Sequence, residues 1–111
     1  MRPRELAFLE EIRRANTEIE EFVNADDFQQ YLSHRPSQLI AERLWIVIGE
    51  SAYKVKKFKP DLLQNVDKMI GLRNRVVHDY ATIDHANVFV ILKEHLPILK
   101  QEVEELLRLH G

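Results

Sequence analysis

The chain has 111 residues, of which 45% are hydrophobic and 31% charged, and its formal net charge is −2. This length allows one domain with a single core, and the composition is that of a globular protein. The absence of cysteine excludes disulfide bridges and thiolate metal sites, and three Gly and four Pro are too few for a turn-rich β fold.

Apolar spacing predicts a first helix over about residues 4–23, because apolar side chains recur there at alternating intervals of four and three. This stripe consists of Phe8, Ile12, Ala15, Ile19 and Phe22. A short helix carrying Phe28, Tyr31 and Leu32 is expected next, with Asp26 as its N-cap.

A longer helix is expected over about residues 36–57, since Pro36 suits the first turn of a helix. Its centre, residues 44–48, reads Leu-Trp-Ile-Val-Ile and is apolar on every side. This predicts a place in the middle of a bundle, or between two subunits. Gly49 costs helix stability, and we expect it to let a neighbouring backbone come close.

Two more helices are predicted in the second half of the chain. After a short helical turn over residues 62–66, Asp67 can cap a helix over about residues 68–78. Asp84 can cap a last helix over about residues 85–109.

Pro97 should kink the last helix, because it removes a backbone donor and crowds the preceding turn. Together, these elements predict an all-α fold, an antiparallel four-helix bundle with one or two short extra helices, in one domain over residues 1–111. No apolar run approaches the roughly 20 residues of a membrane span. The N-terminus also lacks a signal-peptide stretch, so we expect a cytoplasmic protein with no membrane contact.

The segment that carries most chemical information is residues 71–80, with the sequence GLRNRVVHDY. Its residue types suit RNA cleavage without a metal ion or cofactor. His78 could move the proton of a 2′-hydroxyl or a leaving 5′-oxygen, and Arg73 could hold the phosphate. Asn74 and Arg75 are secondary candidates for phosphate contact.

Helix geometry complicates this interpretation, because Arg73 and His78 lie about 140° apart on a regular helix. Both can serve one site only if the helix ends or unwinds near His78, or if a second subunit completes the site. Residue types and spacing alone favour a structural alternative, in which Arg73 and Arg75 pair with Asp79 and His78 caps the helix.

Glu50 follows the apolar centre of the third predicted helix. A buried carboxylate needs a partner, and Arg73 or Arg75 could supply it, which would give Glu50 an orienting role. An exposed Glu50 on the outer face of the helix is an equally open alternative.

The string RNRVVHDY resembles the arginine–histidine motif of HEPN domains, and its tyrosine matches the RX4HXY form of the HepT-like toxins. The segment RLWIVIGESAYKV at residues 43–55 resembles the central helix of the same family. The order of GLRNRVVHDY, a short loop with Ile83 and Asp84, and a long helix with LPILKQEVEELL also follows the family. The resemblance covers nearly the whole chain.

This resemblance implies a metal-independent endoribonuclease that acts as a homodimer, with Arg73 and His78 from two subunits meeting at a cleft. It implies the toxin role in a type VII HEPN/MNT toxin–antitoxin system, with a minimal nucleotidyltransferase as the antitoxin. Tyr80 would then be the target of AMPylation, while a half-buried aromatic that closes the bundle end is its structural alternative. Asn74 would have a supporting role.

Two other functions stay open at this point. One is a non-catalytic HEPN module that binds nucleotides or RNA and partners a nucleotidyltransferase. The other is a purely structural dimer, since a helical bundle can serve as a scaffold without chemistry.

Overall fold

The computed structural model describes the backbone of residues 1–78 and 83–111 and the side chains of residues 1–77 and 83–111. Four long helices dominate: α1 (Pro3–Phe22), α3 (Arg35–Phe58), α4 (Val66–His78) and α6 (Leu96–His110). The short helices α2 (Phe28–Ser33) and α5 (His85–Val90) and a π-helical turn, η2 (Ile91–His95), accompany them, and the described residues contain no strand. The predicted all-α bundle with short extra helices is therefore confirmed.

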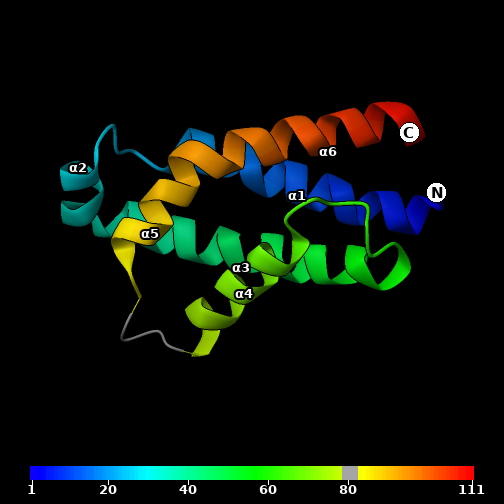
Figure 1. Ribbon diagram of the computed structural model, residues 1–111. Helices are drawn as coiled ribbons and strands as arrows, with labels where there is room; N and C mark the ends of the chain where they lie inside the picture. Colours follow the sequence, from blue (N-terminus) through cyan, green and yellow to red (C-terminus); the bar gives the residue numbers. More distant parts are fainter. Residues whose placement is uncertain (79–82) are drawn as a thin grey trace.

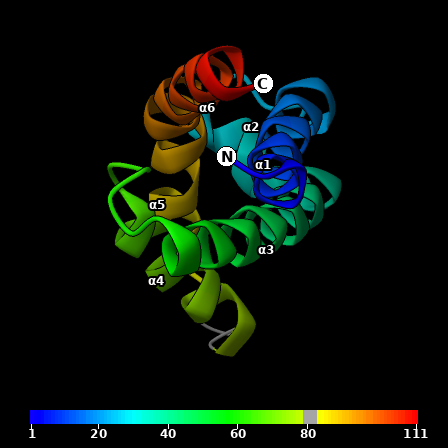
Figure 2. The ribbon, with the colours of Figure 1, turned by 90° about the vertical axis from the view of Figure 1, so that its right-hand side faces the viewer.

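Neighbouring long helices run antiparallel (Figure 1). Helix α1 packs against α3 on one side and α6 on the other, and α4 packs against α3. The end-on view in Figure 2 shows α1, α3 and the arm formed by α5 and α6 around one centre, with α4 at the edge. Among the described residues, α3 is the only helix that packs extensively against α4.

The core forms where the apolar stripes of α1, α3 and α6 meet. From α3, Trp45 and Ile48 are buried, which confirms the central place predicted for its apolar stretch. From α1, Ile12 and Ile19 are buried, but Phe22 is 51% exposed because the helix ends there. No helix in the described part of the chain is long and apolar enough to cross a membrane.

Side-chain caps fix where the short helices begin. The carboxylate of Asp27 accepts a hydrogen bond from the Gln30 N–H at 2.9 Å, so the cap predicted at Asp26 is wrong by one residue. The carboxylate of Asp84 accepts from the Asn87 N–H at 3.2 Å, which confirms the cap predicted for the last helix.

The connection between α3 and α4 differs from the prediction. Residues 62–65 form turns and bends instead of a helical turn, and α4 begins at Val66. Asp67 therefore lies inside the first turn of α4, where its carboxylate pairs with Lys56 Nζ at 2.6 Å. Buried Leu63 and Val66 hold this connection against the core, so apolar burial rather than local helix formation fixes its path.

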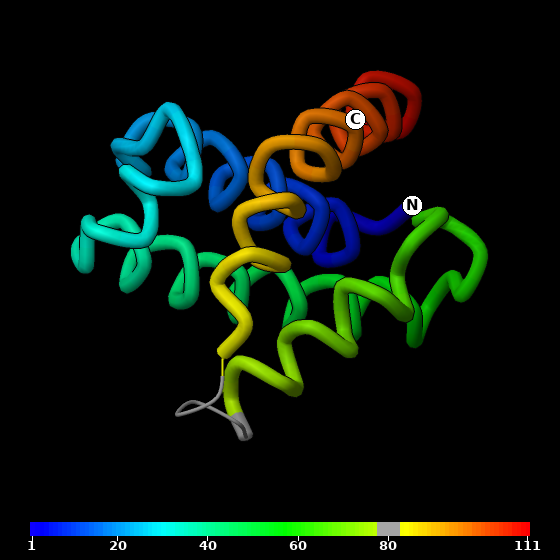
Figure 3. The backbone as a smooth tube through the Cα atoms, turned by 60° about the vertical axis from the view of Figure 1, so that its left-hand side comes forward, coloured from blue at the N-terminus to red at the C-terminus, as the bar shows by residue number. Residues whose placement is uncertain are grey.

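Pro97 distorts the last helix as predicted, although the distortion lies just before the proline. Pro97 is in the first turn of α6, and the preceding residues 91–95 form the π-helical turn. Because proline has no N–H, the turn before it cannot complete its ordinary hydrogen bonds, and the wider π turn absorbs the mismatch. Figure 3 shows the chain changing direction between α5 and α6.

Candidate functional site

Arg73 is held in place by an unusually close approach of α4 to α3. A Cβ atom added at Gly49 would overlap the Cβ of Arg73 and would lie 2.6 Å from its Cγ. The same added atom would lie 3.3 Å from the carbonyl oxygen of Met69. The predicted reason for Gly49, close approach of a neighbouring backbone, is confirmed, and the residue that makes the approach is Arg73.

The stem of Arg73 is held against α3, and no described carboxylate pairs with its guanidinium. The side chain is half-buried, and its Nε–H is buried with no hydrogen-bond partner among the described residues. A buried, unpaired donor costs free energy, and an anionic group that reached it would gain a charge-assisted hydrogen bond.

His78 is the last residue of α4, which stays helical up to that point. On this helix the positions of Arg73 and His78 therefore lie about 140° apart. The side chain of His78 and the whole of Asp79 and Tyr80 lie outside the described residues. The catalytic role of Arg73 and His78 and the modification of Tyr80 stay predictions.

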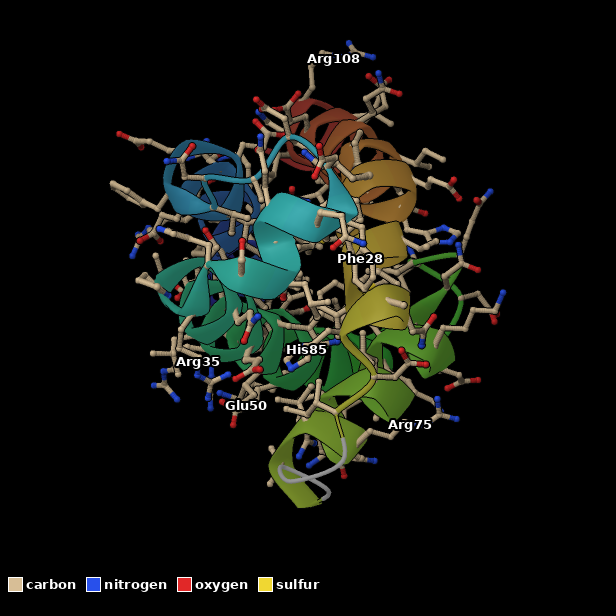
Figure 4. All side chains as sticks on the ribbon, turned by 90° about the vertical axis from the view of Figure 1, so that its left-hand side faces the viewer. Phe28, Arg35, Glu50, Arg75, His85 and Arg108 are labelled. Carbon is tan, nitrogen blue, oxygen red and sulfur yellow. The ribbon has the colours of Figure 1, made fainter. Side chains whose placement is uncertain are left out.

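The three supporting candidates lie on different sides of α4 and α3. Asn74, Arg75 and Glu50 are all exposed, and the described part of the chain shows no ion pair between Glu50 and Arg73 or Arg75. Figure 4 shows Glu50 and Arg75 on opposite sides of α4. Glu50 thus occupies the exposed position that the sequence left open, and its supporting role stays a prediction.

A groove that the sequence did not predict runs between α4 and the arm formed by α5, η2 and α6. Its volume is about 590 Å³. Apolar side chains line it: Trp45, Met69, Leu72, Ile91, Leu96 and Leu99. Arg75 lies at this groove, so the motif segment faces two distinct surfaces, one with Arg73 and one with Arg75. The groove depends on how α4 and the arm pack relative to each other. Such tertiary packing is not encoded by a local sequence pattern.

A buried polar cluster lies where α2, α3 and α5 meet. The ring centroids of Tyr31 and His85 are 6.2 Å apart, and Glu42 is 4% exposed with Arg35 NH1 at 3.7 Å. Burial, together with the charge of Glu42, raises the pKa of the Tyr31 hydroxyl well above its ordinary value. Tyr31 therefore stays neutral at physiological pH.

Metal chemistry has no obvious centre in the described residues, where no group of three or more His, Asp or Glu side chains could hold an ion. On α4, Arg73, which pairs with no described carboxylate, is followed five residues later by a histidine at the end of the same helix. An all-α bundle with an arginine of this kind belongs to the class of proteins that can bind anionic groups such as phosphate.

Comparison with known proteins specifies this class further. The family model described as "Ribonuclease HepT-like" matches residues 12–106. A Methanocaldococcus jannaschii protein named "Putative RNase MJ1380" is 30% identical over 100 residues, which cover 88% of this chain and 92% of the relative. A Thermococcus cleftensis protein named "Probable ribonuclease HepT" is 28% identical over 103 residues, which cover 89% of this chain and 92% of the relative.

The chain therefore belongs to the HepT-like ribonuclease family, within the HEPN superfamily that its motif resembles. Its enzyme class is that of the endoribonucleases. No solved structure matches the chain.

Proposed function

We propose that this protein is the toxin of a type VII HEPN/MNT toxin–antitoxin system, an endoribonuclease that cleaves cellular RNA in the cytoplasm without a metal ion. Residues 1–111 would act as one HepT-like domain. The observation that supports this proposal is Arg73, whose stem packs on Gly49 of α3 while no described carboxylate pairs with its guanidinium. Family membership supplies the reaction class.

In the proposed reaction, His78 moves a proton between the RNA and solvent. A 2′-hydroxyl loses its proton, its oxygen attacks the adjacent phosphorus, and the 5′-oxygen leaves with a proton. Arg73 stabilises the negative charge that develops on the phosphate oxygens, because its fork of N–H donors matches their geometry. Asn74 would support the bound phosphate, and Glu50 would help to orient Arg73 or Arg75.

A homodimer would bring Arg73 of one subunit to His78 of the other, because a single regular helix keeps the two positions apart. Exposed apolar groups beside Arg73 support such an interface. Tyr53 on α3 and Val77 on α4 are each 43% exposed, and half-buried Ile46 shares the outer stripe of α3 with Tyr53. A face of this kind is typical of a surface that a second copy covers.

Control by a minimal nucleotidyltransferase antitoxin would act through charge and bulk. AMPylation of Tyr80 would add a phosphate two residues beyond His78. This negative charge would compete for Arg73 and repel the phosphates of RNA.

The catalytic proposal is tested with Arg73→Ala and His78→Ala. Both variants should lose growth inhibition when expressed in cells, and both should lose RNA cleavage when purified without the antitoxin. Circular dichroism should show unchanged helix content. Full toxicity of both variants would remove the catalytic assignment.

The partner proposal needs a separate measurement. Intact-mass spectrometry of the protein produced with the antitoxin should show increments of whole AMP units, and Tyr80→Phe should show none. AMP on Tyr80→Phe would move the modification to another residue.

A further inference from the structure

The groove between α4 and the α5–η2–α6 arm has the size of a site for a small organic group. Its volume of about 590 Å³ falls within the range of roughly 300–1,000 Å³ that ligand pockets occupy. A second hollow, lined by Ile83 and Val88, shares Leu72, Arg75 and Asn87 with it.

Gly71 is the feature that points to an occupant. It lies in the middle of α4 and lines the groove, and a Cβ added there would meet no atom within 4 Å. Glycine inside a helix costs about 0.5–1 kcal/mol relative to alanine. Gly49 has an intramolecular reason for this cost, the contact with Arg73, whereas Gly71 has none in the described residues. A bare backbone at Gly71 suits the close approach of a flat group from outside.

The groove carries two carboxylates and two cations, Lys68 and Arg75, with which an anionic occupant could pair. Of its two carboxylates, Asp67 is paired with Lys56 at 2.6 Å, and Glu102 accepts a hydrogen bond from the Gln64 N–H at 3.0 Å. The cations Lys68 and Arg75 have no ion-pair partner in the described part of the chain.

Trp45, Met69 and Leu72 give the groove an apolar wall beside these two cations. A ligand that combines a flat aromatic ring with a negative charge would match this wall, the bare backbone at Gly71 and the cations. A nucleotide has both properties.

We propose that this groove binds an unpaired nucleotide of the RNA substrate, with the base stacked over the bare backbone at Gly71 and the phosphate held by Lys68 and Arg75. This inference rests on the proposed function, because the same strand would pass from the groove to the Arg73 side of α4. Positions 73 and 75 are about 200° apart on the helix, so the strand would cross α4 near its C-terminal end. Single-stranded segments offer unstacked bases for such recognition.

Trp45 is the only tryptophan of the chain, which gives a direct measurement of binding at the groove. The full-length protein carrying His78→Ala, so that the RNA stays intact, is titrated with a single-stranded oligoadenylate of about ten nucleotides. We expect saturable quenching of the Trp45 emission. Gly71→Leu in the same background should weaken binding by about tenfold or more, the factor for losing one stacked base.

Two control variants separate loss of the groove from loss of the fold. Gly71→Ala places a methyl group where the base would stack and should weaken binding less than Gly71→Leu does, while the protein unfolds no more easily than the wild type. Glu104→Leu places the same leucine side chain on the exposed face of α6, away from the groove, and should leave binding unchanged.

Three results would overturn the inference. The first is unchanged oligonucleotide binding in Gly71→Leu. The second is quenching by free AMP that the oligonucleotide does not displace, which would make the site one for a mononucleotide. The third is a Gly71→Leu protein that binds RNA normally but escapes its antitoxin, which would make the groove a protein-docking surface.

Cleavage assays keep this inference distinguishable from the proposed function. If Arg73→Ala and His78→Ala abolish cleavage while Gly71→Leu cleaves normally with normal KM, the inference is wrong and the function stands. If the groove binds RNA but the unmodified protein never cleaves it, the function is wrong and the inference stands.

Discussion

Gly49 of α3 and Arg73 of α4 meet with no room for a side chain on the α3 side, since an added Cβ would overlap the Cβ of Arg73. The stem of the arginine thus rests on the backbone of a central helix rather than on flexible side chains. Buried Ile48 and Ala52 hold that part of α3 in the core. When α4 is packed on α3, the stem of the proposed phosphate-binding residue is therefore positioned by a helix that is buried in the core.

We expect Gly49→Ala to destabilise the protein by about 1–3 kcal/mol, because the methyl group forces α4 away from α3. The same displacement should move Arg73 and lower RNA cleavage. Gly71→Ala is the matched control in the neighbouring helix, and it should stabilise the protein by about 0.5–1 kcal/mol. Urea unfolding followed by circular dichroism measures both changes, and equal effects of the two substitutions would contradict the packing argument.

Substitutions of Arg73 and Arg75 should affect different kinetic constants of RNA cleavage, because the two side chains lie on different surfaces of α4. Arg73→Gln should lower kcat by about 100-fold or more, the usual cost of losing a group that stabilises transition-state charge. Arg75→Gln should mainly raise KM and reduce the salt dependence of RNA binding by about one unit of slope. Steady-state cleavage of a labelled RNA at several salt concentrations tests this, and a kcat-only effect of Arg75→Gln would contradict the assignment.

Mixed dimers test whether the site forms between subunits. In a dimer of one Arg73→Ala and one His78→Ala subunit, a cross-subunit arrangement leaves one of the two sites intact. Random mixing makes about half of the dimers mixed, so about a quarter of the wild-type activity should return. Sites contained within single subunits would instead stay inactive in every mixture. The readout is RNA cleavage by the two inactive proteins before and after they are unfolded and refolded together.

Tyr31 should make the protein less stable in alkali. Its hydroxyl is buried with no hydrogen-bond partner in the described part of the chain, and burial together with the charge of Glu42 raises its pKa in the folded state. The contribution of its neutral form to stability is fully present below the unfolded pKa of about 10 and is lost as the pH rises above that value.

Tyr31→Phe removes both effects. We expect the variant to be as stable as the wild type at pH 7, or more stable by about 1 kcal/mol, because an unpaired buried hydroxyl disappears. Above pH 10 the wild type should lose stability faster than the variant. Parallel stability curves from pH 7 to 11, measured by urea unfolding, would show that Tyr31 does not titrate with folding.

The elements of this fold could be predicted because their signals are local. Apolar spacing located α1, α3 and α6, and the spacing of Asp84 to the next helix located its cap. The N-cap of α2 was predicted at Asp26 instead of Asp27 because adjacent aspartates can both cap a helix. Only the structure shows that the first turn of α2 places the Gln30 N–H within reach of Asp27. The helical turn predicted at residues 62–66 was wrong for another reason. The leucines there suggested a helix, but in the structure they lie in turns and bends, where Leu63 is buried.

The candidate site could be predicted less completely. Residue types singled out Arg73, and Gly49 was expected to permit a close approach, but only the structure shows that these two residues meet. The groove beside Arg75 depends on the angle between α4 and α3, which is a property of tertiary packing. For Glu50, the sequence allowed a buried or an exposed position, and packing around α3 selected the exposed one.

Helix α4 carries the motif and packs extensively only against α3 among the described residues, whereas α1 and α3 each pack against two or more helices. A segment held on one side can detach and reclose while the rest of a domain stays folded. Amide protons of α4 should therefore exchange with solvent deuterium before those of α1 and α3. Bound RNA should slow amide exchange more in α4 than in α1 and α3. The substrate would then stabilise the helix that binds it.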